Sequence, residues 1–88
     1  MEQDDNKKMY DYADRFINLA NEMAQTDKSG TVGVAIRFAA ARFSAFEASL
    51  QKKDMATEKD KLVQLFADDF KKMMQYNIED YIRILSQQ

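Results

Sequence analysis

The absence of proline constrains the fold of this chain more than any other feature of its sequence. Proline is missing from all 88 residues, and the only two glycines, Gly30 and Gly33, lie close together. Proline removes a backbone hydrogen bond and clashes with the preceding helical turn, and glycine destabilises a helix by about 1 kcal/mol relative to alanine. Long helices therefore have nothing to interrupt them away from the two glycines. The sequence predicts an all-helical fold.

Apolar residues that recur at three- and four-residue spacing predict three helices. We expect the first helix from about residue 5 to 26, the second from about 31 to 53 and the third from about 57 to 85. Residues 27–30 have the chemistry of a turn, and Thr57 is expected to be the N-cap of the third helix. The pattern leaves two alternatives open at Asn77: a break that starts a short fourth C-terminal helix, or one continuous rod.

The length of the chain predicts a single domain. A chain of this size buries only about 60% of the surface that it exposes when unfolded, which is too little to divide between two cores. We therefore expect one helical domain over residues 1–88. Helices joined by short loops pack antiparallel, so the expected architecture is an up-down-up three-helix bundle. Its core is predicted to contain five phenylalanines: Phe16, Phe43, Phe46, Phe66 and Phe70.

The second helix has a wide apolar arc. At about 100° per residue, its apolar side chains form two stripes beside each other and leave a narrow polar wedge for solvent. The first stripe is Val32, Ala35, Ile36, Ala39, Phe43, Phe46 and Leu50; the second is Val34, Phe38, Ala41 and Ala45; the wedge is Gly33, Arg37, Ser44, Glu47 and Gln51. Such a helix is expected at the centre of a bundle. The alternative is that the second stripe stays partly open for a partner chain, and an identical subunit suits so small a domain.

Arg42 and Asp69 are expected to form a structural ion pair. On a helical wheel, Arg42 lies between the two stripes of the second helix, and Asp69 lies within the apolar face of the third. A buried charge is costly without a partner, and the guanidinium fork matches a carboxylate. An acid of the first helix, such as Asp14, is the alternative partner. If no acid lies nearby, Arg42 or Arg37 would instead suit a small anionic ligand.

The composition excludes most catalytic and metal-binding chemistry. The chain has no histidine and no cysteine, so it lacks an imidazole base, a thiolate nucleophile, the ligands of a zinc finger and any disulfide. Its carboxylates follow neither the pattern of a di-iron bundle nor that of an EF-hand loop. We therefore expect no enzyme activity, no catalytic residues, no cofactor and no metal site.

Charge and hydropathy indicate the cellular compartment of the protein and the kinds of partner that it can have. Thirteen basic and fifteen acidic residues give a net charge of -2, and the basic residues form no continuous stripe, so we do not expect nucleic acid as a partner. The longest strongly apolar stretch, residues 32–46, is too short to span a membrane and carries two arginines, and the acidic start lacks the features of a secretory signal. We expect a cytoplasmic protein with no membrane partner.

Four segments carry a resemblance to a known family: Ala13–Asn21, Ala39–Phe46, Lys71–Met74 and Ile78–Ile82. Through them, nearly the whole chain resembles a family of small uncharacterised proteobacterial proteins, the domain of unknown function 3144. The resemblance implies a short bacterial cytoplasmic protein without an established activity, so no functional residue is carried over from it. The function we expect is a non-catalytic helical module for protein–protein interaction, whose partner is an unknown protein or a second copy in a homodimer.

Overall fold

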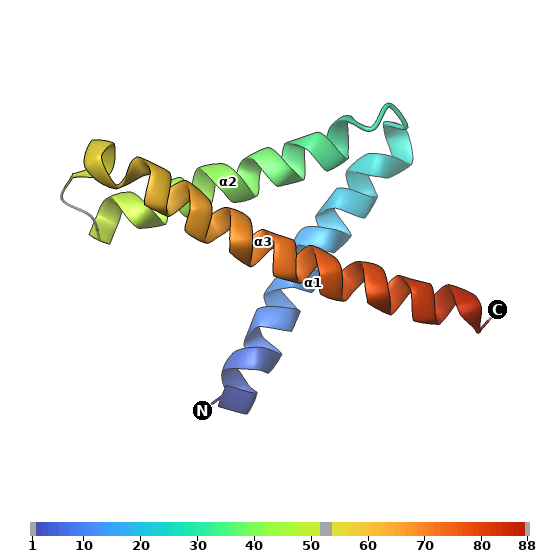
Figure 1. Cartoon of the computed structure of the whole chain (residues 1–88). Coiled ribbons are helices and arrows are strands. Elements are labelled where there is room, and N and C mark those ends of the chain that lie inside the picture. The colour runs from blue at the N-terminus through green and yellow to red at the C-terminus, as the bar shows by residue number, and fades with distance from the viewer. Residues whose placement is uncertain (1, 52–53, 88) are drawn as a thin grey trace. The chain divides into compact units, whose positions relative to one another are not determined.

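The computed structural model describes residues 2–51 and 54–87, and that part of the chain forms three helices and no strand (Figure 1). α1 spans Glu2–Thr26, α2 spans Thr31–Gln51 and α3 spans Met55–Ser86. The predicted all-helical class with three helices is confirmed. The predicted end of the second helix, at residue 53, lies outside the described residues.

α3 runs without interruption through Asn77. The side-chain amide of Asn77 donates a hydrogen bond to the main-chain carbonyl of Met73, one turn earlier, at 2.8 Å. This bond stays within the helix, and the main chain keeps its helical path on both sides of Asn77. Of the two alternatives that the sequence left open, the continuous rod is the one that the structure has.

The turn between α1 and α2 is held by side-chain hydrogen bonds. The carboxylate of Asp27 accepts hydrogen bonds from the backbone N–H of Ser29 at 2.9 Å and from its hydroxyl at 2.6 Å. The oxygen of the Ser29 hydroxyl in turn accepts a hydrogen bond from the backbone N–H of Thr31, at 3.2 Å. Gly30 follows with a φ of +94°, a conformation that favours glycine. The turn predicted at residues 27–30 is confirmed.

The N-cap of α3 is Asp54, and the prediction of Thr57 was wrong. The Asp54 carboxylate accepts hydrogen bonds from the backbone N–H of Thr57 at 3.2 Å and from its hydroxyl at 2.6 Å. Both residue types are good caps, but the earlier one satisfies an amide of the first turn and lets α3 begin at Met55. The same hydrogen bonds from Thr57 stabilise the carboxylate and lower the pKa of Asp54 below its ordinary value.

The chain divides into two units, and the division falls within α2. The first unit contains α1 and the part of α2 that ends at Phe43. The second unit contains the rest of α2, from Ser44, and α3. The single up-down-up bundle over residues 1–88 stays a prediction.

Small side chains make the helix contact in the first unit. Its half-buried residues are Ala13, Ala20 and Ala24 on α1 and Val32 and Gly33 on α2. Ala20 and Ala24 are one turn apart and therefore share a face of α1. Four of these five residues are alanine or glycine, which lets two helices approach closely. The large side chains of this unit remain outside the contact, since Phe16 is 65% exposed and Phe38 is 67% exposed.

The second unit also packs through small residues of α2. Ala48, which is 8% exposed, is the one buried side chain in the described part of the chain, and Ser44, one turn before it, is half-buried. The half-buried apolar residues of α3 fall in its first turns: Met55, Leu62 and Phe66. Residues 62 and 66 share a face of α3, as 44 and 48 share a face of α2. We infer that the Ser44–Ala48 face of α2 packs against the first turns of α3.

This contact corrects the prediction of a solvent-facing wedge on the second helix. Ser44 and Gly33 were expected to face water, and both are half-buried. The wheel ranked positions by hydrophobicity, whereas close helix packing also depends on side-chain volume. Small residues therefore supply the contact that the large apolar residues were expected to supply.

Candidate interaction surfaces

The first apolar stripe of α2 remains exposed beyond the turn. Ile36 is 38% exposed and Leu50, at the other end of the helix, is 71% exposed. Between them, Phe43 and Phe46 also keep more than half of their surface accessible. The second stripe is exposed as well, at Val34 and Phe38. The hairpin contacts thus leave both predicted stripes of α2 accessible.

The second half of α3 forms another exposed apolar surface. α3 has 32 residues and is about 48 Å long, whereas the part of α2 in the same unit, Ser44–Gln51, is only about 12 Å long. The shorter helix can cover only the first turns of α3. From residue 70 onward the large apolar side chains of α3 are exposed: Phe70, Met73, Met74, Tyr76, Ile78, Tyr81, Ile82, Ile84 and Leu85.

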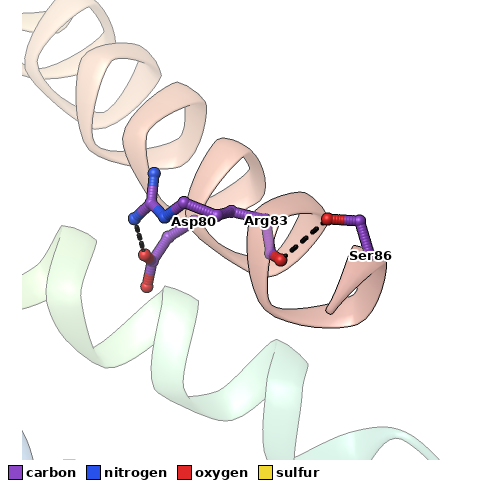
Figure 2. A network of polar contacts seen from close by, with 3 residues as sticks. All are labelled: Asp80, Arg83 and Ser86. Carbon is purple, nitrogen blue, oxygen red and sulfur yellow. Dashed lines mark hydrogen bonds and ion pairs between the residues drawn. The ribbon is translucent and has the colours of Figure 1, made fainter. Parts of the chain in front are cut away.

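Ion pairs in the described residues are local to single helices. Figure 2 shows the guanidinium of Arg83 directed at the carboxylate of Asp80, one turn earlier, with which it forms an ion pair. The hydroxyl of Ser86 donates a hydrogen bond to the main-chain carbonyl of Arg83 at 2.9 Å. On α1, Lys7 pairs with Asp11 at 3.1 Å. Pairs of this kind stabilise a helix by about 0.2–0.5 kcal/mol each and do not create a ligand site.

An open hollow of about 360 Å³ lies inside the α1–α2 turn. Ala20 and Ala24 form its α1 side, Val32 and Gly33 form its α2 side, and Lys28 adds a positive charge from the turn. The guanidinium of Arg37 lies above Gly33, because a Cβ placed on that glycine would be 3.5 Å from Nη1 of Arg37. Two cations and the amino end of α2 therefore lie near the hollow.

Asp27 also lines the hollow and opposes these positive charges. The hydroxyl and the backbone N–H of Ser29 hydrogen-bond to its carboxylate and lower the pKa of Asp27. Asp27 is therefore a carboxylate at neutral pH. An anion in the hollow would meet one fixed negative charge beside the two cations.

The predicted ion pair joins residues of different units. Arg42 belongs to the first unit and Asp69 to the second, and both side chains are exposed in the described structure. The alternative acid, Asp14, is exposed on α1. The pairing of Arg42 with Asp69 or with Asp14 stays a prediction.

The five predicted core phenylalanines differ in exposure. Phe66 is half-buried in the first half of α3, one turn after Leu62. Phe16, Phe43, Phe46 and Phe70 are exposed. The place of these four side chains in a common core stays a prediction.

The described residues contain neither a cluster of metal ligands nor a helix suited to cross a membrane. Within residues 2–51 and 54–87, no three or more acidic side chains come together as a set of metal ligands. None of the helices described here combines the length and the apolar character that crossing a membrane requires.

Comparisons with known proteins give one match. A family model described as a protein of unknown function, DUF3144, matches residues 9–82. This is the family that the four sequence segments resembled, so that prediction is confirmed. Neither the curated proteins nor the solved structures contain a match to the chain.

Proposed function

Because the chain belongs to the DUF3144 family, which is described as being of unknown function, we propose a function from its own surfaces: it is a non-catalytic helical module that binds another protein. The observation that carries this proposal is the difference in burial between small side chains and large apolar side chains. Small residues of α1 and α2 such as Ala20, Ala24 and Ala48 are half-buried or buried, whereas large apolar residues of α2 such as Phe38 and Leu50 stay exposed.

Exposed apolar side chains at helical spacing are suited to protein binding. Burial of one large apolar side chain contributes about 1.5–3 kcal/mol, so a few such residues are enough for a stable complex. On α2, Val34 and Phe38 are one turn apart and present one face to a partner. Helices that bind in a groove of another protein use anchors at this spacing.

The composition supports the non-catalytic part of the proposal. Without histidine and cysteine, general acid–base and nucleophilic chemistry would have to rely on carboxylates, lysine or tyrosine alone. Such groups need environments that shift their pKa values strongly. Two described carboxylates have shifted pKa values, Asp27 and Asp54. Asp27 accepts the hydrogen bonds that hold the α1–α2 turn, and Asp54 caps α3.

Phe38→Glu tests the proposal. If Phe38 contacts a partner, the variant keeps the helix content and the thermal midpoint of the parent but no longer co-purifies with the protein that the parent captures in cells. Gln51→Glu is the matched control, because it adds the same charge at an exposed polar position of α2 and should retain capture. A variant that unfolds, or one that folds and captures the same protein as the parent, contradicts the proposal.

A small anionic ligand is the second candidate, and the position of Arg37 favours it over Arg42. The Arg37 guanidinium lies above Gly33, which lines the hollow together with Lys28. Titration of the labelled chain with inorganic phosphate should then shift the amide resonances of Gly33 and its neighbours, and Arg37→Gln should abolish the shifts. Arg42→Gln is the control and should leave them unchanged. The absence of shifts in the parent would reject this candidate.

A further inference from the structure

The exposed stripe of α2 contains a heptad repeat. Alternating spacings of four and three residues relate Val32, Ile36, Ala39, Phe43, Phe46 and Leu50, which are called the α2 seam below. This is the spacing of the a and d positions in a two-stranded coiled coil. In that register Ile36, Phe43 and Leu50 occupy a positions, and Val32, Ala39 and Phe46 occupy d positions. α2 is one helix from Thr31 to Gln51, so the seam lies along one face.

The contacts of α2 within the two units leave most of the seam accessible. Ser44 and Ala48, which face α3, occupy the b and f positions, on the far side of α2 from the seam. In the first unit, α1 reaches the seam beside the turn, at Val32, which is half-buried. Ile36 and Leu50 are exposed. The contacts within each unit therefore leave the seam accessible from Ile36 onward.

Two opposite charges flank the seam, one on each side. Arg42 directly precedes Phe43 and occupies a g position, and Glu47 directly follows Phe46 and occupies an e position. The other flanking positions of the helix carry no charge: Gly33 and Ala40 on the Glu47 side, and Ala35 and Ser49 on the Arg42 side. The seam thus has a positive flank and a negative flank.

This charge pattern selects both the partner and its direction. In a parallel pair of helices, a g residue faces the e residue that lies five positions later on the other helix. Arg42 would then face Glu47 of the partner subunit, and the twofold symmetry would form the same pair a second time. In an antiparallel pair, like flanks face each other and neither pair forms. The seam is complementary to a second, parallel copy of itself.

We propose that the chain forms a homodimer in which α2 pairs in parallel with α2 of a second copy through the α2 seam. This inference goes beyond the proposed function, because the α2 seam is a different face of α2 from the one that carries Val34 and Phe38. It also assigns a partner to Arg42 that differs from Asp69. The two assignments lead to different rescue experiments.

Light scattering and sedimentation of the full-length chain test the dimer. The parent should have the mass of a dimer, and Arg42→Glu should raise the dimer dissociation constant at least tenfold, because two pairs then become repulsive. Glu47→Arg should do the same. The double variant should recover the parent's affinity. Arg37→Glu, which makes the same charge change away from the seam, should leave the dissociation constant unchanged.

Mixing the two single variants tests the charge complementarity of the flanks, and an introduced cysteine tests the parallel direction. The Arg42→Glu chain and the Glu47→Arg chain should each dimerise poorly alone and form a heterodimer when mixed, because both flanks then carry opposite charges. A single cysteine introduced by Leu50→Cys should form an intermolecular disulfide on oxidation. In an antiparallel pair centred on the seam, residue 50 would lie opposite residue 32, and the disulfide would not form.

Three outcomes would overturn the inference. The first is a parent chain that is monomeric at all concentrations. The second is recovery of dimer affinity in Arg42→Glu by Asp69→Lys instead of by Glu47→Arg. The third is a mixture of the two single variants that contains no heterodimer. A monomeric parent whose captured protein is still lost with Phe38→Glu would reject the homodimer and leave the proposed function standing. A dimeric parent with the predicted charge rescue supports the parallel α2 pair.

Discussion

The same substitution at the two glycines of this chain should have opposite effects on stability. Gly30 has a φ of +94°, and a Cβ added there would meet no atom within 4 Å. Gly33 lies inside α2 and has an ordinary helical backbone, and a Cβ added there would meet Arg37 at 3.5 Å, a normal van der Waals contact. Neither site has a steric obstacle to alanine, so backbone conformation alone decides the sign of each effect.

The magnitudes follow from the two backbone conformations. Gly30→Ala should lower the free energy of unfolding by about 1–2 kcal/mol, which is the cost of holding an L-residue at positive φ. Gly33→Ala should raise it by about 0.5–1 kcal/mol, because alanine is the better helix former and loses less conformational entropy on folding. The two variants should therefore differ by about 1.5–3 kcal/mol, a large share of the roughly 5 kcal/mol typical of a small domain.

Urea denaturation followed by circular dichroism measures both effects at one fixed protein concentration. The transition midpoints should move in opposite directions with the slope unchanged, since neither change alters the surface exposed on unfolding. Gly30→Asn serves as the control for conformation, because asparagine tolerates positive φ, and it should lose less stability than Gly30→Ala. If Gly30→Ala matches the parent, or if Gly33→Ala is the less stable of the two alanine variants, the assignment of the turn and of the helix start is wrong.

Three further predictions concern the second unit and the two capping carboxylates. Ala48→Leu should overpack the contact between α2 and α3 and lower the free energy of unfolding by about 1–3 kcal/mol in urea, whereas the exposed Ala45→Leu should stay near the parent; equal effects would show that the contact is misplaced. Asp54→Ala should fray the first turn of α3 and speed hydrogen exchange of the amides of residues 55–58, and Asp54→Asn, which keeps a capping oxygen, should not. Folding lowers the pKa values of Asp27 and Asp54, so their stabilising effect is complete above the ordinary aspartate pKa of about 3.9 and disappears as the pH falls through the lowered values. Urea midpoints measured below about pH 4 should therefore fall less steeply in the Asp54→Asn variant than in the parent.

Local chemistry explains why the helix boundaries near the first turn could be predicted from the sequence. α1 ends at Thr26 and α2 begins at Thr31, as expected, because Asp27, Ser29 and Gly30 form a turn through bonds that span only two residues. The start of α3 was harder to place. Asp54 and Thr57 are both good capping residues, and only the geometry shows that the carboxylate accepts from the threonine.

The candidate surfaces could be predicted in part. The two stripes of α2 follow directly from helical spacing, and the exposed residues Phe38 and Leu50 lie on them. The half-buried positions of Gly33 and Ser44 could not be predicted in the same way. A helical wheel weighs the hydrophobicity of each side chain, but it does not weigh how closely a small side chain lets another helix approach.

The sequence by itself determined the all-helical class, the turn at residues 27–30 and the periodicity of the α2 seam, because each depends on bonds or spacings within a few residues along one chain segment. Only the tertiary structure decided which residues of α2 are covered: Ser44 is half-buried and Ala48 is buried, whereas the large apolar residues Phe38 and Leu50 are exposed. That choice depends on how side-chain volumes fit between segments that are distant in the sequence. Spacing within one helix contains no information about that fit.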